Sequence, residues 1–268
     1  MVKECEVTMD RVILITGASR GLGQVMYEHL SRVDGFKVYG TSRRPRNSGL
    51  LSLDIRSDTS VKDCLATIIT IEGHLDVLIN NVGSNLIGSL EGTSMEAYEN
   101  QMALNFYGTL RMMKAVMPYF RQRKQGRIIN ISSIGARIPL PFNSSYAASK
   151  AALEAMSISF SSEIDLGKVF VSLVEPIALS IEDEVPNLTY IDHEKAYHQA
   201  SKKMFEKMRR EVKPSVSKLE VALLVEKVIK SRQPRLTYRV GKEAGFLIVA
   251  KLVLPFRWFQ YLMKKALL

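Results

Sequence analysis

Short apolar runs alternate with longer segments of helical period along the first two thirds of the chain. The runs are rich in Val, Ile and Leu, which is the composition of strands that are buried on both faces. They cover residues 11–16, 36–41, 50–54, 76–80, 126–132 and 168–174. Because a turn or a predicted helix follows each run, the pattern predicts an α/β fold of the Rossmann type: a doubly wound parallel β-sheet with helices on both faces, in three layers.

The regular alternation ends after the sixth run. Residues 177 to about 193 contain acidic and turn-forming residues without a clear period, which predicts a mobile loop. A helix is predicted next, and a further helix opens with a capping box formed by Ser217 and Glu220. The first of these helices carries on one face Tyr197, Ala200, Met204, Met208 and Val212. We expect residues 177–213 to cover a substrate site, although ordinary helix packing would produce the same stripe.

Composition favours a single domain in a reducing compartment. The chain has 268 residues, 46% of them hydrophobic, and no Pro-, Gly- or Ser-rich linker divides it, so residues 1–268 are predicted to form a single domain. Two cysteines, Cys5 and Cys64, are too few for a disulfide framework. The chain opens with polar and acidic residues where a secretory signal needs an apolar run. A cytoplasmic protein is expected.

The formal net charge of +10 is concentrated near the C-terminus. Residues 230–268 hold nine Lys or Arg and one acid, Glu243, whereas the rest of the chain is nearly balanced. We therefore predict no nucleic-acid partner for the fold as a whole. Polar and proline residues interrupt the apolar segment 243–268 well before the roughly 18 residues that a spanning helix needs. The segment would pack against the core or a sister subunit, or lie on an anionic membrane surface.

A glycine-rich turn follows the first apolar run. Gly17 permits a sharp bend, Gly21 lets the backbone approach a pyrophosphate, and Gly23 allows close packing of helix on strand. The N-terminus of the next helix would face the anion. The predicted cofactor contacts in this turn are Gly17, Ser19, Arg20, Gly21, Leu22 and Gly23.

The residues after the second run predict which dinucleotide binds. An acid at this position accepts from a ribose 2′-hydroxyl, whereas a cation pairs with a 2′-phosphate. The chain has Ser42 and Arg43 there and no acid, and Arg20 adds a second cation. NADP(H) is therefore the predicted cofactor. A solvated basic loop is the alternative, because Arg44 and Arg46 extend the charge beyond what one phosphate requires.

Tyr146 and Lys150 form a candidate acid–base pair. A tyrosine with an ordinary pKa of about 10 donates or accepts protons poorly unless a cation lies nearby. The spacing of four residues places both side chains on one face of a predicted helix. The same spacing occurs at two other tyrosines, but only this pair follows a strand that ends in Ser132 and Ser133. A hydroxyl there would hold the substrate oxygen.

These segments together resemble the single-domain short-chain dehydrogenases and reductases, most strongly over about residues 10–180. Residues 80–83, Asn-Asn-Val-Gly, are similar to the Asn-Asn-Ala-Gly signature of that family. The resemblance implies that Asn105 holds a water in a proton relay and that Ser133 orients the substrate beside Tyr146 and Lys150. It also implies a homodimer or homotetramer. The further cofactor contacts that it implies are Asp54, Ile55, Asn81, Pro176 and Leu179.

Two positions depart from the family pattern. Ile177 follows Pro176 where glycine is usual, and Ile181 stands where a threonine normally binds the nicotinamide carboxamide. Ser180 by a small loop shift, or the backbone of Ile177 and Leu179, would have to take that role. His193 and His198 have neither the spacing nor the third partner of a metal site, so no metal is predicted.

The predicted activity is NADPH-dependent hydride transfer to or from the carbonyl or alcohol group of a mainly apolar substrate, such as a ketone or aldehyde of lipid, steroid or polyketide type. Besides Ser133, the predicted substrate contacts are Leu140, Phe142 and Ile177, with Pro141, Leu179, Met204 and Met208 nearby. Two alternatives stay open. One is a catalytically weak dinucleotide-binding regulator or scaffold, and the other is a membrane-surface or nucleic-acid binder that works through its basic tail.

Overall fold

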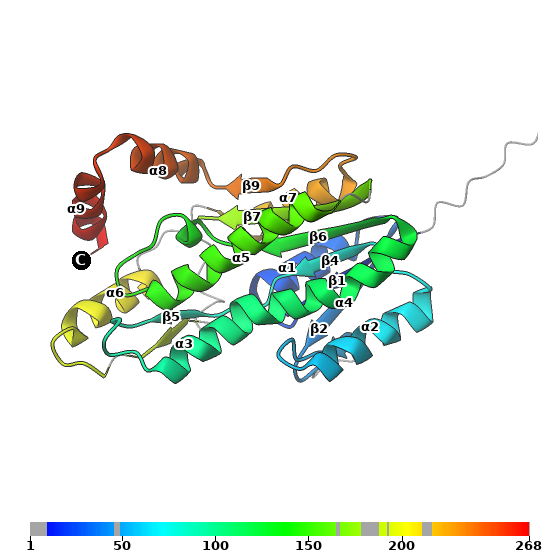
Figure 1. The fold of residues 1–268 in the computed structure, drawn as a ribbon, viewed down its shortest axis with the longest axis horizontal. Helices are drawn as coiled ribbons and strands as arrows, with labels where there is room; N and C mark the ends of the chain where they lie inside the picture. The colour runs from blue at the N-terminus through cyan, green and yellow to red at the C-terminus, as the bar shows by residue number, and fades with distance from the viewer. Residues whose placement is uncertain are drawn as a thin grey trace, which may run out of the picture.

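The computed structural model describes residues 10–45, 49–164, 167–177, 188–191, 193–210 and 216–267. Seven strands form one parallel sheet in the order β3-β2-β1-β4-β6-β7-β9 (Figure 1). They are β1 (Arg11–Ile15), β2 (Phe36–Ser42), β3 (Leu50–Ser52), β4 (Val77–Asn80), β6 (Gln125–Ile131), β7 (Lys168–Pro176) and β9 (Thr237–Val240). The strand order reverses between β1 and β4, and this switch point is where Rossmann-type folds place a nucleotide.

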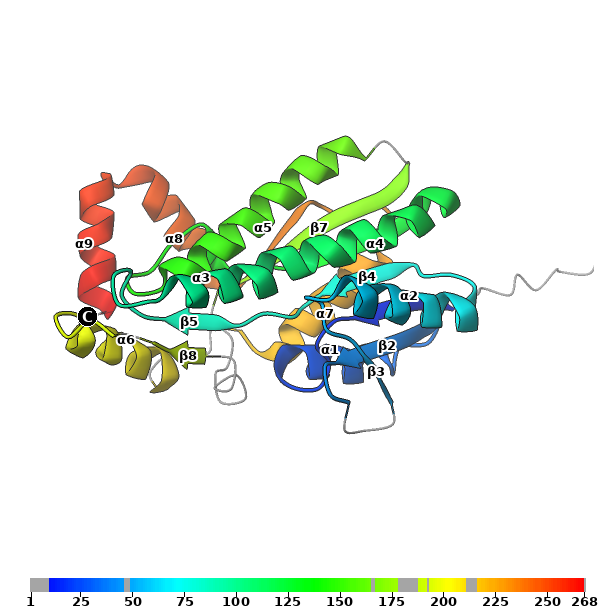
Figure 2. The same cartoon turned by 60° about the horizontal axis from the view of Figure 1, so that its bottom comes forward.

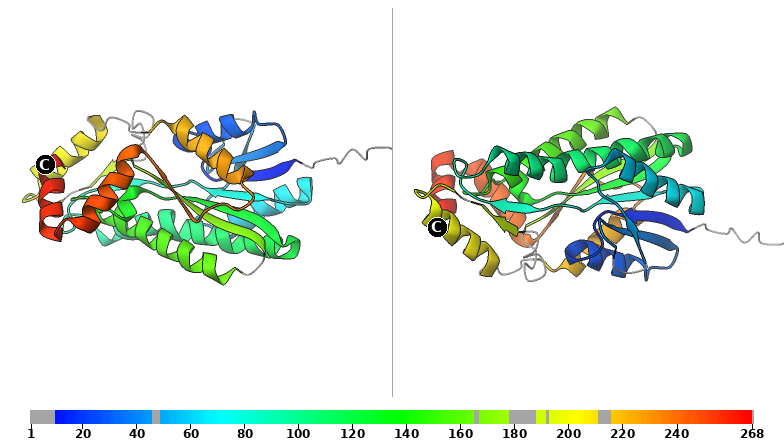
Figure 3. Two further views of the ribbon diagram at one scale, coloured as in Figure 1. Left: turned by 90° about the horizontal axis from the view of Figure 1, so that it is seen from above. Right: turned by 90° about the horizontal axis from the view of Figure 1, so that it is seen from below.

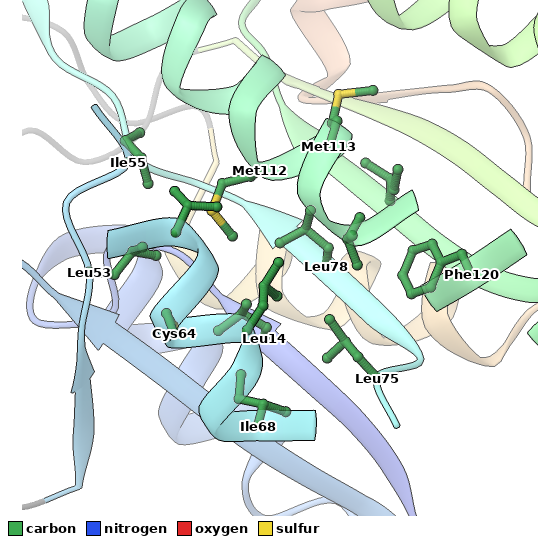
Figure 4. Packing of buried hydrophobic residues seen from close by; sticks show 14 of the residues in the cluster. Leu14, Leu53, Ile55, Cys64, Ile68, Leu75, Leu78, Met112, Met113 and Phe120 are labelled. Atoms are coloured by element: carbon green, nitrogen blue, oxygen red, sulfur yellow. The ribbon is translucent and has the colours of Figure 1, made fainter. Parts of the chain in front are cut away.

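Helices cover both faces of the sheet (Figure 3). One face carries α2 (Asp58–Glu72), α4 (Gly108–Arg123) and α5 (Ser144–Glu163), and the other carries α1 (Gly21–Leu30) and α7 (Lys218–Lys230). Strand β1 serves both layers, because Val12 and Leu14 point to one core and Ile13 and Ile15 to the other. Figure 4 shows the first core, in which Met112 and Phe120 of α4 pack with Leu14, Leu78 and α2.

The remaining elements lie beyond the carboxyl ends of the strands, at one end of the molecule (Figures 1 and 2). Helix α3 (Met95–Met102) runs through a π-helical turn, η1 (Ala103–Tyr107), into α4. A short parallel pair joins β5 (Asn85–Ile87) to β8 (Leu188–Tyr190), and α6 (His198–Arg210) follows it. The chain ends in a helical hairpin, α8 (Lys242–Val253) and α9 (Phe256–Leu267).

The predicted doubly wound sheet and single domain are confirmed, and all six predicted strands are present with no end shifted by more than two residues. The sequence patterns missed β5, β8 and β9, each of which has only three or four residues. The loop predicted for residues 177–193 is wrong over residues 188–190, which form β8 because β5 offers a free edge to pair with. The capping box of α7 is confirmed, since Ser217 and Glu220 exchange side-chain and backbone hydrogen bonds.

The described residues contain neither a candidate metal cluster nor a membrane-spanning helix. Within these ranges, no group of three or more His, Cys, Asp or Glu side chains could hold a metal ion. No helix in the described part of the chain has both the length and the apolar character that crossing a bilayer requires.

Candidate active site

Three glycines, Gly17, Gly21 and Gly23, shape the turn between β1 and α1. Gly17 and Gly21 have φ angles of +72° and +59°, which favour glycine. A Cβ atom on Gly23 would lie 2.1 Å from the carbonyl oxygen of Gly17. Helix α1 begins at Gly21, and in the described structure neither a side-chain cap nor an acidic residue occupies its first turn. Its N-terminus without a side-chain cap and its positive dipole end therefore fit an anion such as a pyrophosphate.

Asn81, from the end of β4, holds this turn in place. Its side-chain Nδ2 donates to the backbone oxygens of Thr16 (3.0 Å) and Gly17 (3.1 Å), and its backbone N–H donates to Thr16 Oγ1 (2.9 Å). From the other side, the backbone N–H of Gly17 donates to Thr41 Oγ1 of β2 (3.2 Å). The side-chain amide of Asn81 is thus committed to the turn itself. Its contact with the cofactor stays a prediction.

The residues predicted to select the cofactor lie at the ends of β2 and β3. Arg43 is exposed directly after β2, and Arg20 is exposed at the start of α1. Hydrogen bonds from Arg56, at 2.8 Å for Nη2, lower the pKa of the Asp54 carboxyl, and the positive charge of Arg43 acts in the same direction. Ile55 is buried against Gly108, so a cofactor contact there would use its backbone.

The structure brings the four predicted catalytic residues together. An ideal Cβ on Gly83 would lie 3.4 Å from Asn105 Oδ1 and 3.6 Å from Lys150 Nζ. An ideal Cβ on Gly135 would lie 3.4 Å from both Ser133 Oγ and Tyr146 Cε1. Lys150 Nζ is 5.9 Å from the centre of the Tyr146 ring and donates to the Ile131 carbonyl (2.8 Å). The two glycines therefore mark one site, lined by side chains from η1 and α5 and by Ser133, which caps η2.

Asn105 is fully buried in the π-helical turn η1. Its Oδ1 accepts from the Ser84 N–H (3.0 Å), and its Nδ2 donates to the Ser84 carbonyl and to Ser149 Oγ (both 3.0 Å). Ser149 Oγ donates in turn to the Tyr146 carbonyl (2.7 Å). The side chain therefore links η1 to the first turns of α5, and the predicted relay water stays a prediction. Single π-helical turns of this kind are frequent at functional sites.

Ser133 lies two residues after the end of β6 and caps the 3-10 turn η2 (Ile134–Ala136). Its Oγ accepts from the Gly135 N–H (3.1 Å). A hydroxyl that accepts one hydrogen bond keeps a proton with which to donate another. Ser133 Oγ is therefore fixed in place by the Gly135 N–H and can donate a hydrogen bond of its own.

A network of ion pairs around two buried carboxylates, Glu154 and Glu175, begins next to Ser133 and was missed by sequence reasoning. Ser132 Oγ donates to Glu154 (2.8 Å), Arg137 lies 3.4 Å from Glu154 and 2.8 Å from Glu175, and Arg239 lies 3.3 Å from Glu175. Burial raises the pKa of the Glu154 carboxyl, and the negative charge of Glu175 acts in the same direction. The network ties η2 to α5, β7 and β9. Residues so far apart in the chain leave no local signal.

A small apolar cluster forms the other side of the site. Its buried members are Ile134, Ile138 and Phe259, and around them pack Leu140, Ile177, Leu247, Ile248, Ala250, Leu254 and Met263. The predicted substrate contacts Leu140 and Ile177 are thus brought together with α8 and α9, which the sequence patterns did not assign to this site. Met204 of α6 is fully buried, which agrees with the alternative that the stripe on this helix serves ordinary helix packing. Phe142 has a left-handed backbone (φ 60°), and its carbonyl accepts from the Gly88 N–H.

Ile177, which stands where the family pattern has glycine, packs its side chain against Gly241, the residue before α8. A Cβ on Gly241 would lie 2.3 Å from Ile177 Cγ2, and Gly241 has a φ of +110°. The Ile177 side chain therefore occupies the space that Gly241 leaves open between β9 and α8, and it follows the buried Pro176. The predicted contacts of Leu179, Ser180 and Ile181 lie outside the described residues.

Comparison with known proteins agrees with this geometry. Residues 11–183 match the family model described as short chain dehydrogenase. A 3-ketodihydrosphingosine reductase from Bacteroides thetaiotaomicron is 43% identical over 170 residues, which cover 62% of this chain and 63% of that protein. Retinol dehydrogenase 8 from Bos taurus is 32% identical over 91% of this chain and 86% of that protein. The match thus spans less than two thirds of the first relative's length.

Two solved structures share the fold over nearly the whole chain. A short-chain dehydrogenase from Streptomyces avermitilis has a TM-score of 0.82 at 25% identity, covering 99% of this chain and 98% of that one. A short chain dehydrogenase from Burkholderia cenocepacia J2315, solved in complex with NADP, has a TM-score of 0.73 at 27% identity, covering 97% of this chain and 99% of that one.

Proposed function

The chain belongs to the short chain dehydrogenase family, and from this premise we propose that it is an NADPH-dependent oxidoreductase acting on the carbonyl or alcohol group of a mainly apolar substrate. The observation that carries the proposal is the convergence of Tyr146, Lys150 and Ser133 around Gly83 and Gly135. A proton donor, a cation and a hydroxyl meet there, beside the turn that fits a pyrophosphate.

Each of these side chains has a role in handling the substrate oxygen. The nicotinamide, when bound, supplies or accepts the hydride. Tyr146 donates the proton of its hydroxyl to the substrate oxygen during reduction, and the Lys150 ammonium stabilises the phenolate that is left. Ser133 donates a hydrogen bond to the same oxygen and so holds it in front of Tyr146. Asn105 acts through Ser149, because this pair fixes the turn of α5 that carries Tyr146.

The preference for NADPH rests on the cations around the end of β2. Arg43 is exposed directly after β2, Arg20 is exposed at the start of α1, and the carboxylate of Asp54 is already paired with Arg56. A 2′-phosphate would meet positive charge rather than a competing acid. The Burkholderia neighbour was solved with NADP, which supports the same cofactor for this chain.

A long apolar substrate fits the site better than a sugar. The wall after Ser133 is formed by Ile134, Ile138 and Leu140, packed against α8 and α9. Two relatives are named for 3-ketodihydrosphingosine and for retinol, and both molecules are long and mostly apolar. A lipid-like ketone or its alcohol is therefore the proposed substrate class. Residues 177–213 are proposed to cover it.

The cofactor proposal is tested by fluorescence titration of NADPH and NADH. Wild-type protein is expected to prefer NADPH, and Arg43→Ala is expected to weaken NADPH binding by about tenfold or more while leaving NADH binding nearly unchanged. Arg32→Ala, another exposed arginine at the far end of α1, is the matched control and should leave both affinities unchanged. Equal affinity for both nucleotides in the wild type would contradict the NADPH preference.

The reaction proposal is tested by following NADPH oxidation with long-chain aliphatic ketones, retinoid and steroid carbonyls, and a reducing sugar for contrast. Tyr146→Phe is expected to lower turnover by about a hundredfold or more, because it removes the proton donor without changing the ring. NADPH binding by this variant should persist, which shows that the fold is intact. Unchanged turnover in Tyr146→Phe would overturn the assignment of the proton donor.

A further inference from the structure

The outer side of the α8–α9 hairpin exposes an unusual concentration of large apolar side chains. Among the described residues, 16 large hydrophobic side chains are exposed, and eight of them lie in these two helices, whereas the others are scattered over five elements and two loops. They are Phe246, Val249, Leu252, Val253, Phe256, Trp258, Tyr261 and Leu262. We call these eight residues the hairpin patch. A contiguous apolar surface of this kind marks an interaction site.

The two helices are anchored by their opposite side. Phe259 is only 7% exposed, and it packs with Ile134 and Ile138, whereas its neighbour Trp258 is 68% exposed. The inner residues of α8 join the same cluster. Because both helices turn their inner faces to one small core, the hairpin patch faces away from the protein, at the end of the molecule seen in Figures 1 and 2.

From Phe246 to the end of α9, the charged side chains of the two helices are all positive. Arg257, Lys264 and Lys265 are exposed on α9, and the sequence contains no Asp or Glu from residue 244 to 268. Trp258, Tyr261 and Lys265 follow one another at spacings of three and four residues, so they share one face of α9. Aromatic side chains flanked by lysines on one helical face are typical of helices that lie in the plane of a membrane surface.

We propose that the hairpin patch docks the protein on an anionic bilayer surface, with α8 and α9 lying in the interface and their apolar side chains reaching the acyl boundary. A second copy of the chain fits this surface less well. In a two-fold dimer the same patch meets itself, so Arg257, Lys264 and Lys265 of each copy would face positive charge without an acid to pair with. An anionic headgroup layer supplies the missing negative charge.

Docking at this place has a consequence that rests on the proposed function. The inner side of the hairpin contacts Ile134, Ile138 and Leu140, the residues that follow Ser133. A lipid that leaves the bilayer beside α8 and α9 would meet the apolar wall of the active site first. The docking itself depends only on the surface, so it can be tested without cofactor or substrate.

The chain carries its own probe, because Trp258 is its only tryptophan and lies within the hairpin patch. The experiment records Trp258 emission of the full-length wild type with vesicles of phosphatidylcholine alone and of phosphatidylcholine mixed with phosphatidylglycerol. The anionic vesicles are expected to shift the emission to shorter wavelength, and brominated acyl chains are expected to quench it. Salt should weaken the effect. An emission unchanged by anionic vesicles would overturn the proposal.

Variants measured by vesicle co-sedimentation separate the apolar from the charged contribution. Phe246→Ser is expected to lower the partition coefficient by about tenfold, and Lys264→Gln with Lys265→Gln by about fivefold per charge on anionic vesicles. The controls are Ile71→Ser and Lys62→Gln on α2, which are also exposed and should bind like the wild type. If the patch instead joins two copies, Phe246→Ser would convert an oligomer to a monomer without changing vesicle binding, which would also overturn the proposal. Loss of turnover with vesicle binding intact would count against the proposed function alone.

Discussion

The glycine turn after β1 and the α8–α9 hairpin differ in what holds them. The turn is held by hydrogen bonds from Thr41 and Asn81 on two neighbouring strands, and Gly23 leaves no space for even one methyl group. The hairpin is held by a small apolar cluster and by a hydrogen bond from Lys251 to the Arg137 carbonyl. A site for an invariant pyrophosphate needs rigid backbone, whereas a surface that meets a substrate or membrane needs only side chains of the right polarity.

The largest expected effect on stability comes from breaking the ion pair of Arg137, beside the hairpin, with the buried Glu175. Arg137→Met is expected to lower the free energy of unfolding by about 3 kcal/mol, because Glu175 is fully buried and loses its main partner. Urea unfolding measures the loss. Arg239→Met is the control: Arg239 also contacts Glu175 but is more exposed, so its loss should be clearly smaller. Equal losses in the two variants would show that the network does not depend on Arg137.

A single methyl group should have opposite effects in the two regions. Gly23→Ala is expected to cost about 1–3 kcal/mol of stability through overpacking and to weaken NADPH binding by about a hundredfold, because the Cβ displaces the Gly17 carbonyl. Gly245→Ala in α8 meets no atom within 4 Å, so it should stabilise the protein by up to about 1 kcal/mol. Thermal unfolding and nucleotide titration measure both. Similar losses of stability in both variants would show that the glycine turn and α8 tolerate an added methyl group equally.

The smallest expected effect concerns the pH dependence of stability. Burial raises the pKa of Glu154, so the folded protein holds this proton more tightly than the unfolded chain does. Stability from this group is therefore present below its ordinary pKa of 4.5 and is lost as pH rises through the raised value. Glu154→Gln keeps an oxygen for the Ser132 hydroxyl and removes the titration. The stability of this variant should fall less than that of the wild type as pH rises from 4.5. Parallel curves of unfolding free energy against pH would show that Glu154 does not cause the dependence.

Much of the candidate site could be predicted because its motifs are local. The turn of residues 17–23, the Tyr146–Lys150 pair and Ser133 each belong to one short segment whose spacing carries the chemistry. The network of Arg137, Glu154 and Glu175 could not be predicted, because its members come from separate elements and have no common spacing. The contact of Ile177 with Gly241 could not be predicted either, because these two residues also come from separate elements.

The sequence by itself determined the order of strands and helices, the parallel sheet and the place of the glycine turn, since buried runs and glycines act through local conformation. It also determined that the positive charge gathers in the last 39 residues. Only the tertiary structure decided that this segment forms two helices, one side of which packs beside Ser133 while the other stays exposed. The reason is physical: α8 is apolar on nearly every side, so it has no preferred inner face until a neighbouring surface covers one.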